Sequence, residues 1–206
     1  MPRKTDKRVR LIEAAKVLIH QQGFNLTTLA DIAQEADVPL GNVYYYFKTK
    51  EAIGEAVIEK RAVEYAEMLI RLDEHADSLA RLRAFIELGT EELELTARYG
   101  CPVGGLCQEL GKQGGPLADQ AAKLLHDVLL WTEKQFKTLG FAEKSEELAL
   151  NLVSTVQGMH LLTHTFKDPK IAQRQSQTLL VWLDSLMSSK KANVVGSTQE
   201  HAGAMA

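Results

Sequence analysis

The chain of 206 residues has little cysteine and no long apolar run, and each shortage excludes a class of protein. Its two cysteines cannot form the disulfide framework of a small secreted protein. No apolar stretch approaches the roughly 20 residues that cross a bilayer, and the opening MPRKTDKRVR lacks the apolar segment of a signal peptide. We therefore expect a cytoplasmic protein without a membrane partner.

Alternating strand patterns are absent as well, and helical periodicity covers most of the chain. A hydrophobic content of 45% suffices for one good core, or for a small domain beside a larger one. The pattern predicts a third helix that begins at Pro39 and a fourth, capped by Thr49, that runs towards Leu72. The other predicted helices cover about 5–22, 29–35, 77–98, 102–112, 116–139, 143–166 and 169–189.

Charge is divided unevenly along the chain. Residues 1–50 hold eight Lys or Arg and five Asp or Glu, a net +3, whereas the other 156 residues hold 16 basic and 22 acidic ones, a net −6. A basic first quarter on an acidic body suits a head that binds a polyanion. An ordinary solvated charge face explains the same division about equally well.

The segment from Thr27 to Lys50, TTLADIAQEADVPLGNVYYYFKTK, carries the strongest signal. Thr28 is a natural N-cap for a short helix, and 36–38 forms a tight turn before the next helix. Two short helices joined in this way can lay one helix in a DNA groove, with phosphate contacts on either side. No catalytic constellation has an obvious place in the segment.

These residues resemble the DNA-binding domain of the TetR (tetracycline-repressor-like) family of transcriptional regulators, over about residues 8–60. The resemblance implies a homodimer that binds a palindromic operator in double-stranded DNA and is usually released by a small-molecule effector. It also implies an all-α fold with two domains. These are a helix-turn-helix DNA-binding domain at 1–50, from which a fourth helix connects, and a helical-bundle ligand-binding and dimerisation domain at 51–188. The residues that follow are polar, small and non-periodic, which separately predicts a disordered tail at 189–206.

Matching the family pattern onto this chain predicts its DNA contacts. Spacing directs Tyr44 and Phe47 to the core, and Tyr45 and Tyr46 outward to phosphates or base edges. Leu40 stands where a polar residue is common in the family, so contact with thymine methyls and reliance on phosphates and DNA shape are expected. The predicted DNA-binding residues are Thr28, Leu40, Gly41, Asn42, Tyr45, Tyr46 and Lys50.

The segment GCPVG around Cys101 is the most distinctive part of the body. Pro102 suggests that Cys101 sits at a helix N-terminus, where the dipole favours thiolate. Cys107 lies about 240° further around a helix, which disfavours a metal pair or a disulfide and suits a small core residue. GCPVG also resembles a subset of the TetR family in which some members respond to electrophiles or oxidants through a cysteine. Cys101 is thus either structural or a reactive sensor.

An effector pocket is expected among the middle helices, although each candidate is as well explained as plain core. Two histidines at helical spacing, His160 and His164, have no carboxylate or cysteine nearby in the sequence that completes a metal site. We therefore expect no metal and no cofactor. The predicted ligand or sensor residues are Cys101, Tyr65, Met68, Phe85, Leu106, Trp131 and Met159.

The last two predicted helices carry long apolar stripes, and Ser154 and Gly158 would allow another helix to approach closely. Such helices from two subunits can form an isologous four-helix interface, or they can simply close the core of one subunit. The stripes comprise Leu148, Leu152, Val156, Met159, Leu162, Leu179, Leu180, Trp182, Leu183 and Leu186.

The leading hypothesis is a ligand-responsive DNA-binding repressor that is not an enzyme. The alternative is a helical ligand carrier that does not bind DNA, or a cysteine-dependent enzyme that uses Cys101 with a histidine. The sequence has no paired carboxylates, nucleophile elbow or phosphate-cradling loop to support that alternative.

Overall fold

The computed structural model describes the backbone of residues 4–203 and the side chains of residues 7–190. This part of the chain is all-α, without a strand, as predicted. Its elements are α1 (Lys4–Gln22), α2 (Leu29–Glu35), α3 (Leu40–Tyr46), α4 (Lys50–Asp73), α5 (Ser78–Leu88), α6 (Leu93–Tyr99), α7 (Pro102–Gln113), α8 (Pro116–Thr138), the short 3-10 helix η1 (Ala142–Lys144), α9 (Ser145–Phe166) and α10 (Pro169–Gly203).

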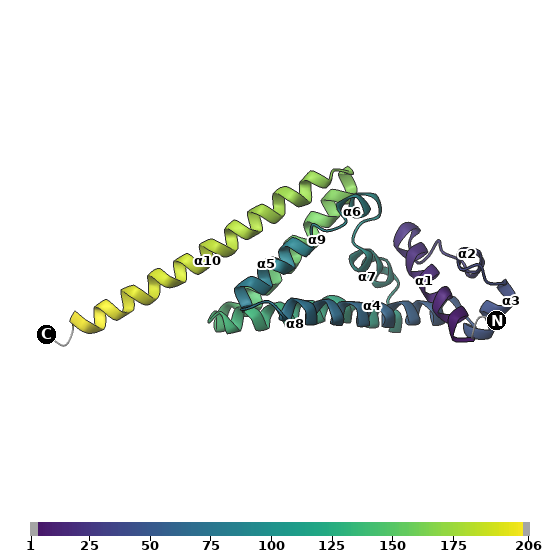
Figure 1. Ribbon diagram of the computed structural model, residues 1–206, viewed down its shortest axis with the longest axis horizontal. Coiled ribbons are helices and arrows are strands. Elements are labelled where there is room, and N and C mark those ends of the chain that lie inside the picture. The colour runs from purple at the N-terminus through teal and green to yellow at the C-terminus, as the bar shows by residue number, and fades with distance from the viewer. Residues whose placement is uncertain (1–3, 204–206) are drawn as a thin grey trace.

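Helices α1, α2 and α3 form a head at one end of the molecule (Figure 1). Helix α4 leaves the head and runs along the base of the body beside α8. Its 24 residues span about 36 Å, so one rigid element joins the head to the far end of the body. Helices α5 and α9 also pack on α8, and α10 packs on α9, α5 and α6 to complete the body.

The core of the head does not end at α4. Buried residues of α1, α2 and α3 pack with Ile53 and Val57 of α4 and continue into Leu106 and Leu110 of α7. A second core holds the body together, around Phe136 of α8 and the apolar faces of α5, α9 and α10. The domain boundary near residue 50 stays a prediction, but the head packs directly on α7.

The single helix predicted over 77–98 is wrong, because the chain forms two helices there. Helix α5 ends at Leu88, and Glu92 adopts a left-handed conformation with φ 51° before α6 starts. Gly89 approaches α9 so closely that an added Cβ would lie 2.8 Å from Met159 Cε. Periodicity continues across this break, so only the packing against α9 reveals it.

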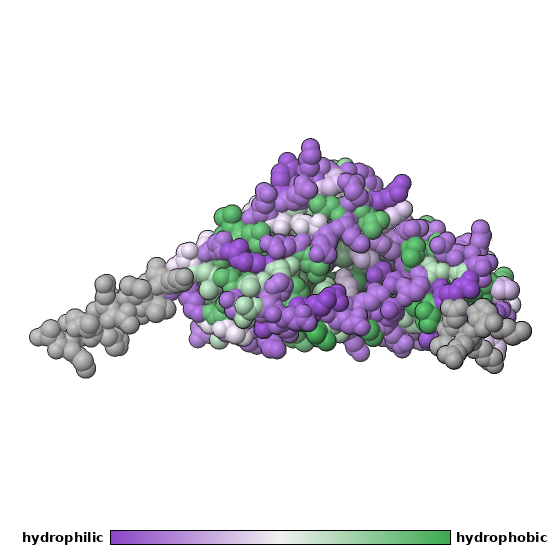
Figure 2. All heavy atoms as spheres, in the orientation of Figure 1, coloured by the Kyte–Doolittle hydropathy of each residue, from purple (hydrophilic) through white to green (hydrophobic). Residues whose placement is uncertain are grey.

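Most of the apolar stripe on α9 and α10 closes the subunit's own core. Leu152, Val156 and Leu183 are buried against α5 and α8. Among the side chains described on these helices, the large apolar ones that stay exposed are Leu150, Leu161, Leu162, Phe166 and Val181. Figure 2 shows such hydrophobic patches among mostly hydrophilic side chains on one face of the molecule.

The tail predicted to be disordered, residues 189–206, lies almost wholly beyond Lys190, outside the residues whose side chains the structure describes. That expectation stays a prediction. Across the described residues, no helix is both long enough and apolar enough to span a membrane.

Candidate functional site

The turn between α1 and α2 is built around a reciprocal cap. The Thr28 hydroxyl accepts a hydrogen bond from the Asp31 N–H at 3.1 Å, and the Asp31 carboxylate accepts one from the Thr28 N–H at 2.9 Å. Hydrogen bonds from Thr28 also hold the pKa of Asp31 below its usual range. This capping box fixes the start of α2, as the sequence predicts. Thr28 itself remains exposed.

Helix α3 is fastened to the head by Val43 and Phe47, which are almost fully buried. Leu40, Tyr44 and Tyr45 of the same helix are exposed, with exposed fractions of 42%, 48% and 63%. Phe47 follows the last helical residue as an extended C-cap, so it anchors the end of α3. The exposed side chains of α3 are therefore the ones that can meet a partner.

The direction predicted for two tyrosines is wrong by one residue. Tyr44 is exposed rather than buried, and Tyr46 packs partly against the core of the head, three residues after Val43. The rings of Tyr45 and Tyr46 meet edge to face with centroids 5.0 Å apart. Tyr44 and Tyr45 are thus the outward pair, and Tyr46 belongs mainly to the packing of α3.

The remaining predicted DNA contacts in this region belong to α3 and to the start of α4. Gly41 is exposed, and an added Cβ would meet no atom within 4 Å. Asn42 and Lys50 are half-buried. Lys50, at the start of α4, donates to the Asn25 carbonyl at 2.8 Å and lies 4.8 Å from the centre of the Phe24 ring.

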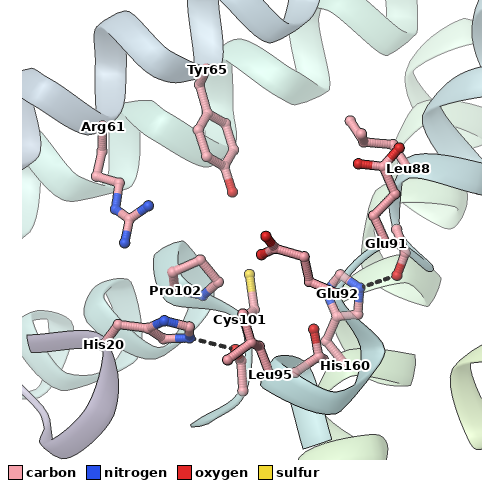
Figure 3. Close-up of a pocket in the computed structure, with 13 residues that line it drawn as sticks. His20, Arg61, Tyr65, Leu88, Glu91, Glu92, Leu95, Cys101, Pro102 and His160 are labelled. Carbon is pink, nitrogen blue, oxygen red and sulfur yellow. Dashed lines mark hydrogen bonds between the residues drawn. The ribbon is translucent and has the colours of Figure 1, made fainter. Parts of the chain in front are cut away.

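A second candidate site is the cavity in front of Cys101, with a volume of about 260 Å³ (Figure 3). Cys101 is the N-cap of α7, as predicted, and its sulfur accepts a hydrogen bond from the Gly104 N–H at 3.3 Å. In Figure 3, Tyr65 and Arg61 reach in from α4 on the side opposite the sulfur. The lining residues are His20, Arg61, Tyr65, Leu88, Gly89, Glu91, Glu92, Leu95, Thr96, Gly100, Cys101, Pro102 and His160.

The electrostatics of this cavity favour a charged sulfur. Burial alone would raise the pKa of the Cys101 thiol, but His160 and the Gly104 N–H outweigh it and bring the pKa below its usual value. Burial would likewise lower the pKa of His160, yet Cys101 and the Gly89 carbonyl raise it above its usual value. Burial, with Cys101 nearby, raises the pKa of Tyr65, which therefore keeps its proton.

Cys107 has a different role from Cys101. Its thiol donates to the Ala121 carbonyl at 3.2 Å and packs against the core of the head. Burial, and then the proximity of Cys101, raises its pKa to about 11. Both cysteines are free thiols. Cys107 is a small packing residue, as its spacing predicts.

The structure brings Tyr65 and Cys101 into one cavity but disperses the other predicted pocket residues. Met68 lines a separate cavity against α5. Phe85 and Trp131 pack against each other with ring centroids 5.9 Å apart, inside the core of the body. Leu106 and Met159 are likewise buried in the two cores, and none of these four lines the Cys101 cavity.

Sequence reasoning missed His20, Arg61 and Glu92 as cavity residues. They come from α1, α4 and the end of the α5–α6 connection, and no spacing links them to Cys101. Within the described residues, no group of three His, Cys, Asp or Glu side chains could hold a metal ion.

Comparison with known proteins agrees with the geometry of the head. The family model described as bacterial regulatory proteins of the tetR family matches residues 11–57, which cover α2, α3 and most of α1. The chain is 32% identical to the transcriptional regulator AcuR of Cereibacter sphaeroides over 142 residues, 68% of this chain and 64% of AcuR. The chain belongs to the TetR family.

Other TetR-family relatives match over shorter or more divergent stretches. The repressor NemR of Escherichia coli is 29% identical over 115 residues, which are 51% of this chain and 58% of NemR. The chain spans 64% of the length of AcuR and 49% of the length of another relative, the HTH-type transcriptional regulator YfiR of Bacillus subtilis. These relatives are regulators rather than enzymes, which agrees with the prediction for this chain.

Solved structures share the whole fold. The regulatory protein TetR from Rhodobacter sphaeroides superposes with a TM-score of 0.73 at 26% identity, covering 83% of this chain and 95% of that one. The reduced form of Escherichia coli NemR superposes with a TM-score of 0.71 at 20% identity, covering 84% and 94%. The TetR fold therefore extends over the body as well as the head.

In this TetR-family chain, two sets of hydrogen bonds join the head to the segment that carries Cys101. His20 of α1 bonds the Gly100 carbonyl at 2.9 Å, directly before Cys101. Glu109 of α7 accepts hydrogen bonds from the Phe24 and Asn25 N–H groups, both at 2.7 Å. Helix α7 thus runs from the cavity to the loop that precedes α2.

Proposed function

We propose that this protein is a DNA-binding transcriptional regulator that acts as a repressor. A homodimer binds a palindromic operator, and a small molecule or an electrophile that enters the Cys101 cavity releases it. The observation that carries the proposal is the outward face of α3. Leu40, Tyr44 and Tyr45 stand exposed on a short helix that the buried Val43 and the buried C-cap residue Phe47 fasten to the head.

The chemistry of that face suits a DNA groove. Leu40 offers apolar contact to a thymine methyl, and Asn42 offers an amide to a base edge. The Lys50 ammonium has three donors, so it can keep its bond to the Asn25 carbonyl and still bind a phosphate. Thr28 contributes a hydroxyl at the exposed start of α2. Such a face relies on phosphates and DNA shape more than on bidentate base contacts.

Dimerisation through α9 and α10 is supported by their exposed apolar side chains. Leu161, Leu162 and Phe166 of α9 and Val181 of α10 are between 46% and 69% exposed. Gly158 has open space in front of it, where a partner helix can approach. Two heads on one dimer reach half-sites about one helical turn apart, ~34–36 Å.

Release requires an effector with different affinities for two head spacings. The Cys101 cavity is lined by α1 and α4 as well as by the body, so its occupant touches the elements that position the head. The relative NemR is named a transcriptional repressor, which supports repression rather than activation for this chain.

Selection from a library of random DNA duplexes tests the proposal. At about 0.1 M salt, the protein should enrich a palindromic sequence and bind it more tightly than competitor DNA. Leu40→Ser and Tyr45→Ala should lose that preference, whereas Val181→Ser should weaken dimerisation without altering the face of α3. If no sequence is enriched and the protein instead shows turnover that Cys101→Ser abolishes, the cysteine-dependent enzyme replaces this proposal.

A further inference from the structure

His160 is a half-buried histidine in which one ring nitrogen forms a hydrogen bond and the other, Nδ1, is buried without one. Its Nε2 donates to the Gly89 carbonyl at 2.7 Å, a bond drawn as a dashed line in Figure 3, and this bond fixes the ring. Among the described residues, no hydrogen-bond partner satisfies the buried Nδ1. A buried polar atom left in that state costs about 1–3 kcal/mol. If a neighbouring acid transfers its proton to Nδ1, the new N–H can donate a hydrogen bond to the anion left behind, and the cost is offset.

The Cys101 thiol is the neighbouring acid that can give a proton to His160, because both residues line the same cavity. Its sulfur lies at the N-terminus of α7, where it accepts the Gly104 N–H and faces the positive end of the helix dipole. Cys101 and His160 line the same cavity, Cys101 from the start of α7 and His160 from α9 (Figure 3). In agreement with this placement, His160 lowers the pKa of the Cys101 thiol, and Cys101 raises the pKa of His160. A proton moved from sulfur to imidazole therefore satisfies both groups.

The charges around the pair come from every element packed on the cavity. Arg61 brings one positive charge to the lining of the cavity, and Glu91 and Glu92 bring two negative ones, which favour an imidazolium but oppose a thiolate. Tyr65 stays neutral and points its hydroxyl towards the sulfur in Figure 3. The facing titratable groups are His20 on α1, Arg61 and Tyr65 on α4, Glu91 and Glu92 before α6, Cys107 on α7 and His164 on α9.

We propose that Cys101 and His160 form a thiolate–imidazolium pair, and that the cavity takes small soft electrophiles such as alkenes conjugated to a carbonyl group. The sulfur lone pair forms a bond to the β carbon, and the alkene electrons move to the carbonyl oxygen. Tyr65 can donate a hydrogen bond to that oxygen. The proton that left the thiol passes from His160 to the α carbon, so the adduct contains all atoms of both reactants and needs no oxidant.

The effect of the pair on DNA binding rests on the proposed function, whereas the pair itself does not. Alkylation turns the anionic sulfur into a neutral thioether and weakens the bond from Gly104 that caps α7. The added group also occupies the space between α4 and α7. Both changes act on the helix that holds the head through Glu109.

Alkylation by iodoacetamide, followed peptide by peptide with mass spectrometry, tests the pair. In the native protein, Cys101 should react at about pH 6 nearly as fast as at pH 8, because its thiolate is already formed. Cys107 is the internal control and should react slowly throughout. His160→Gln keeps a donor for Gly89 but cannot take the proton, so Cys101 should slow about tenfold or more at pH 6 and follow an ordinary thiol titration.

Thiolate absorbance near 240 nm gives a second readout that needs no histidine variant. A titration of native protein minus Cys101→Ser should show one thiolate already present at about pH 6. An ordinary thiol titration of Cys101 in native protein, or an unchanged rate profile in His160→Gln, refutes the pair. If Cys101 behaves as expected but no DNA is bound, the proposed function fails and the pair stands. If DNA is bound and Cys101 titrates as an ordinary thiol, only the pair fails.

Discussion

Glu109→Gln should loosen the connection between α7 and the head. Both carboxylate oxygens of Glu109 are used, one by the Phe24 N–H and the other by the Asn25 N–H, each at 2.7 Å. Glutamine has nearly the same shape but offers one acceptor and one donor. One backbone N–H therefore loses its partner, and the other keeps a neutral hydrogen bond in place of a charged one.

The magnitude follows from those two bonds. A hydrogen bond to a charged group contributes about 1.5–3 kcal/mol, and a neutral one about 1 kcal/mol. Because the site is partly exposed, the lower end applies, and the variant should lose about 2 kcal/mol of local stability. That loss corresponds to a roughly 30-fold larger population of the open loop.

Amide hydrogen exchange measures this population directly. The amides of Phe24 and Asn25 should exchange roughly 30-fold faster in Glu109→Gln than in the native protein. Glu55→Gln, which removes the same charge from an exposed position on α4, is the matched control and should leave both amides unchanged. Exchange within about twofold of the native rate at both amides would show that Glu109 does not hold the loop.

Three further changes test the head. Lys50→Met should weaken binding to all DNA sequences about equally and reduce the slope of log affinity against log salt by about 1, as measured by fluorescence anisotropy. Thr28→Ala should cost about 1 kcal/mol in urea unfolding because it removes the cap of α2, and Thr28→Ser should restore most of it. Gly54→Ala should lower the melting temperature, since its Cβ would lie 2.8 Å from Phe24 Cε2, and overpacking costs about 1–3 kcal/mol. An unchanged melting temperature would mean that Phe24 moves aside freely.

Local chemistry accounts for what could be predicted of the fold. Thr28 and Thr49 cap α2 and α4 because a hydroxyl can satisfy a backbone N–H three residues later. Gly23, with φ 90°, follows α1 because glycine tolerates that conformation. Each of these signals depends only on residues within one turn of the boundary, so the sequence contains it.

The effector cavity could be predicted only in part. Cys101 was recognisable because Pro102 marks a helix start, and Tyr65 because it lies on a half-apolar face of its helix. Phe85, Trp131 and Met159 have the same apolar character, but they fill the core of the body. Apolar periodicity identifies the buried face of a helix and does not distinguish a core neighbour from an empty space.

The sequence by itself determined the all-α class, the helix-turn-helix pattern of Thr27–Lys50 and the position of Cys101 at the start of a helix, because these follow from periodicity and capping. Only the tertiary structure decided that Tyr44, rather than Tyr46, faces outward, since a seven-residue helix can rotate by one residue until its neighbours fix it. It also decided that His160 meets Cys101. The two residues lie 59 positions apart in the chain, and the packing of α9 against Gly89 and α6 brings them together.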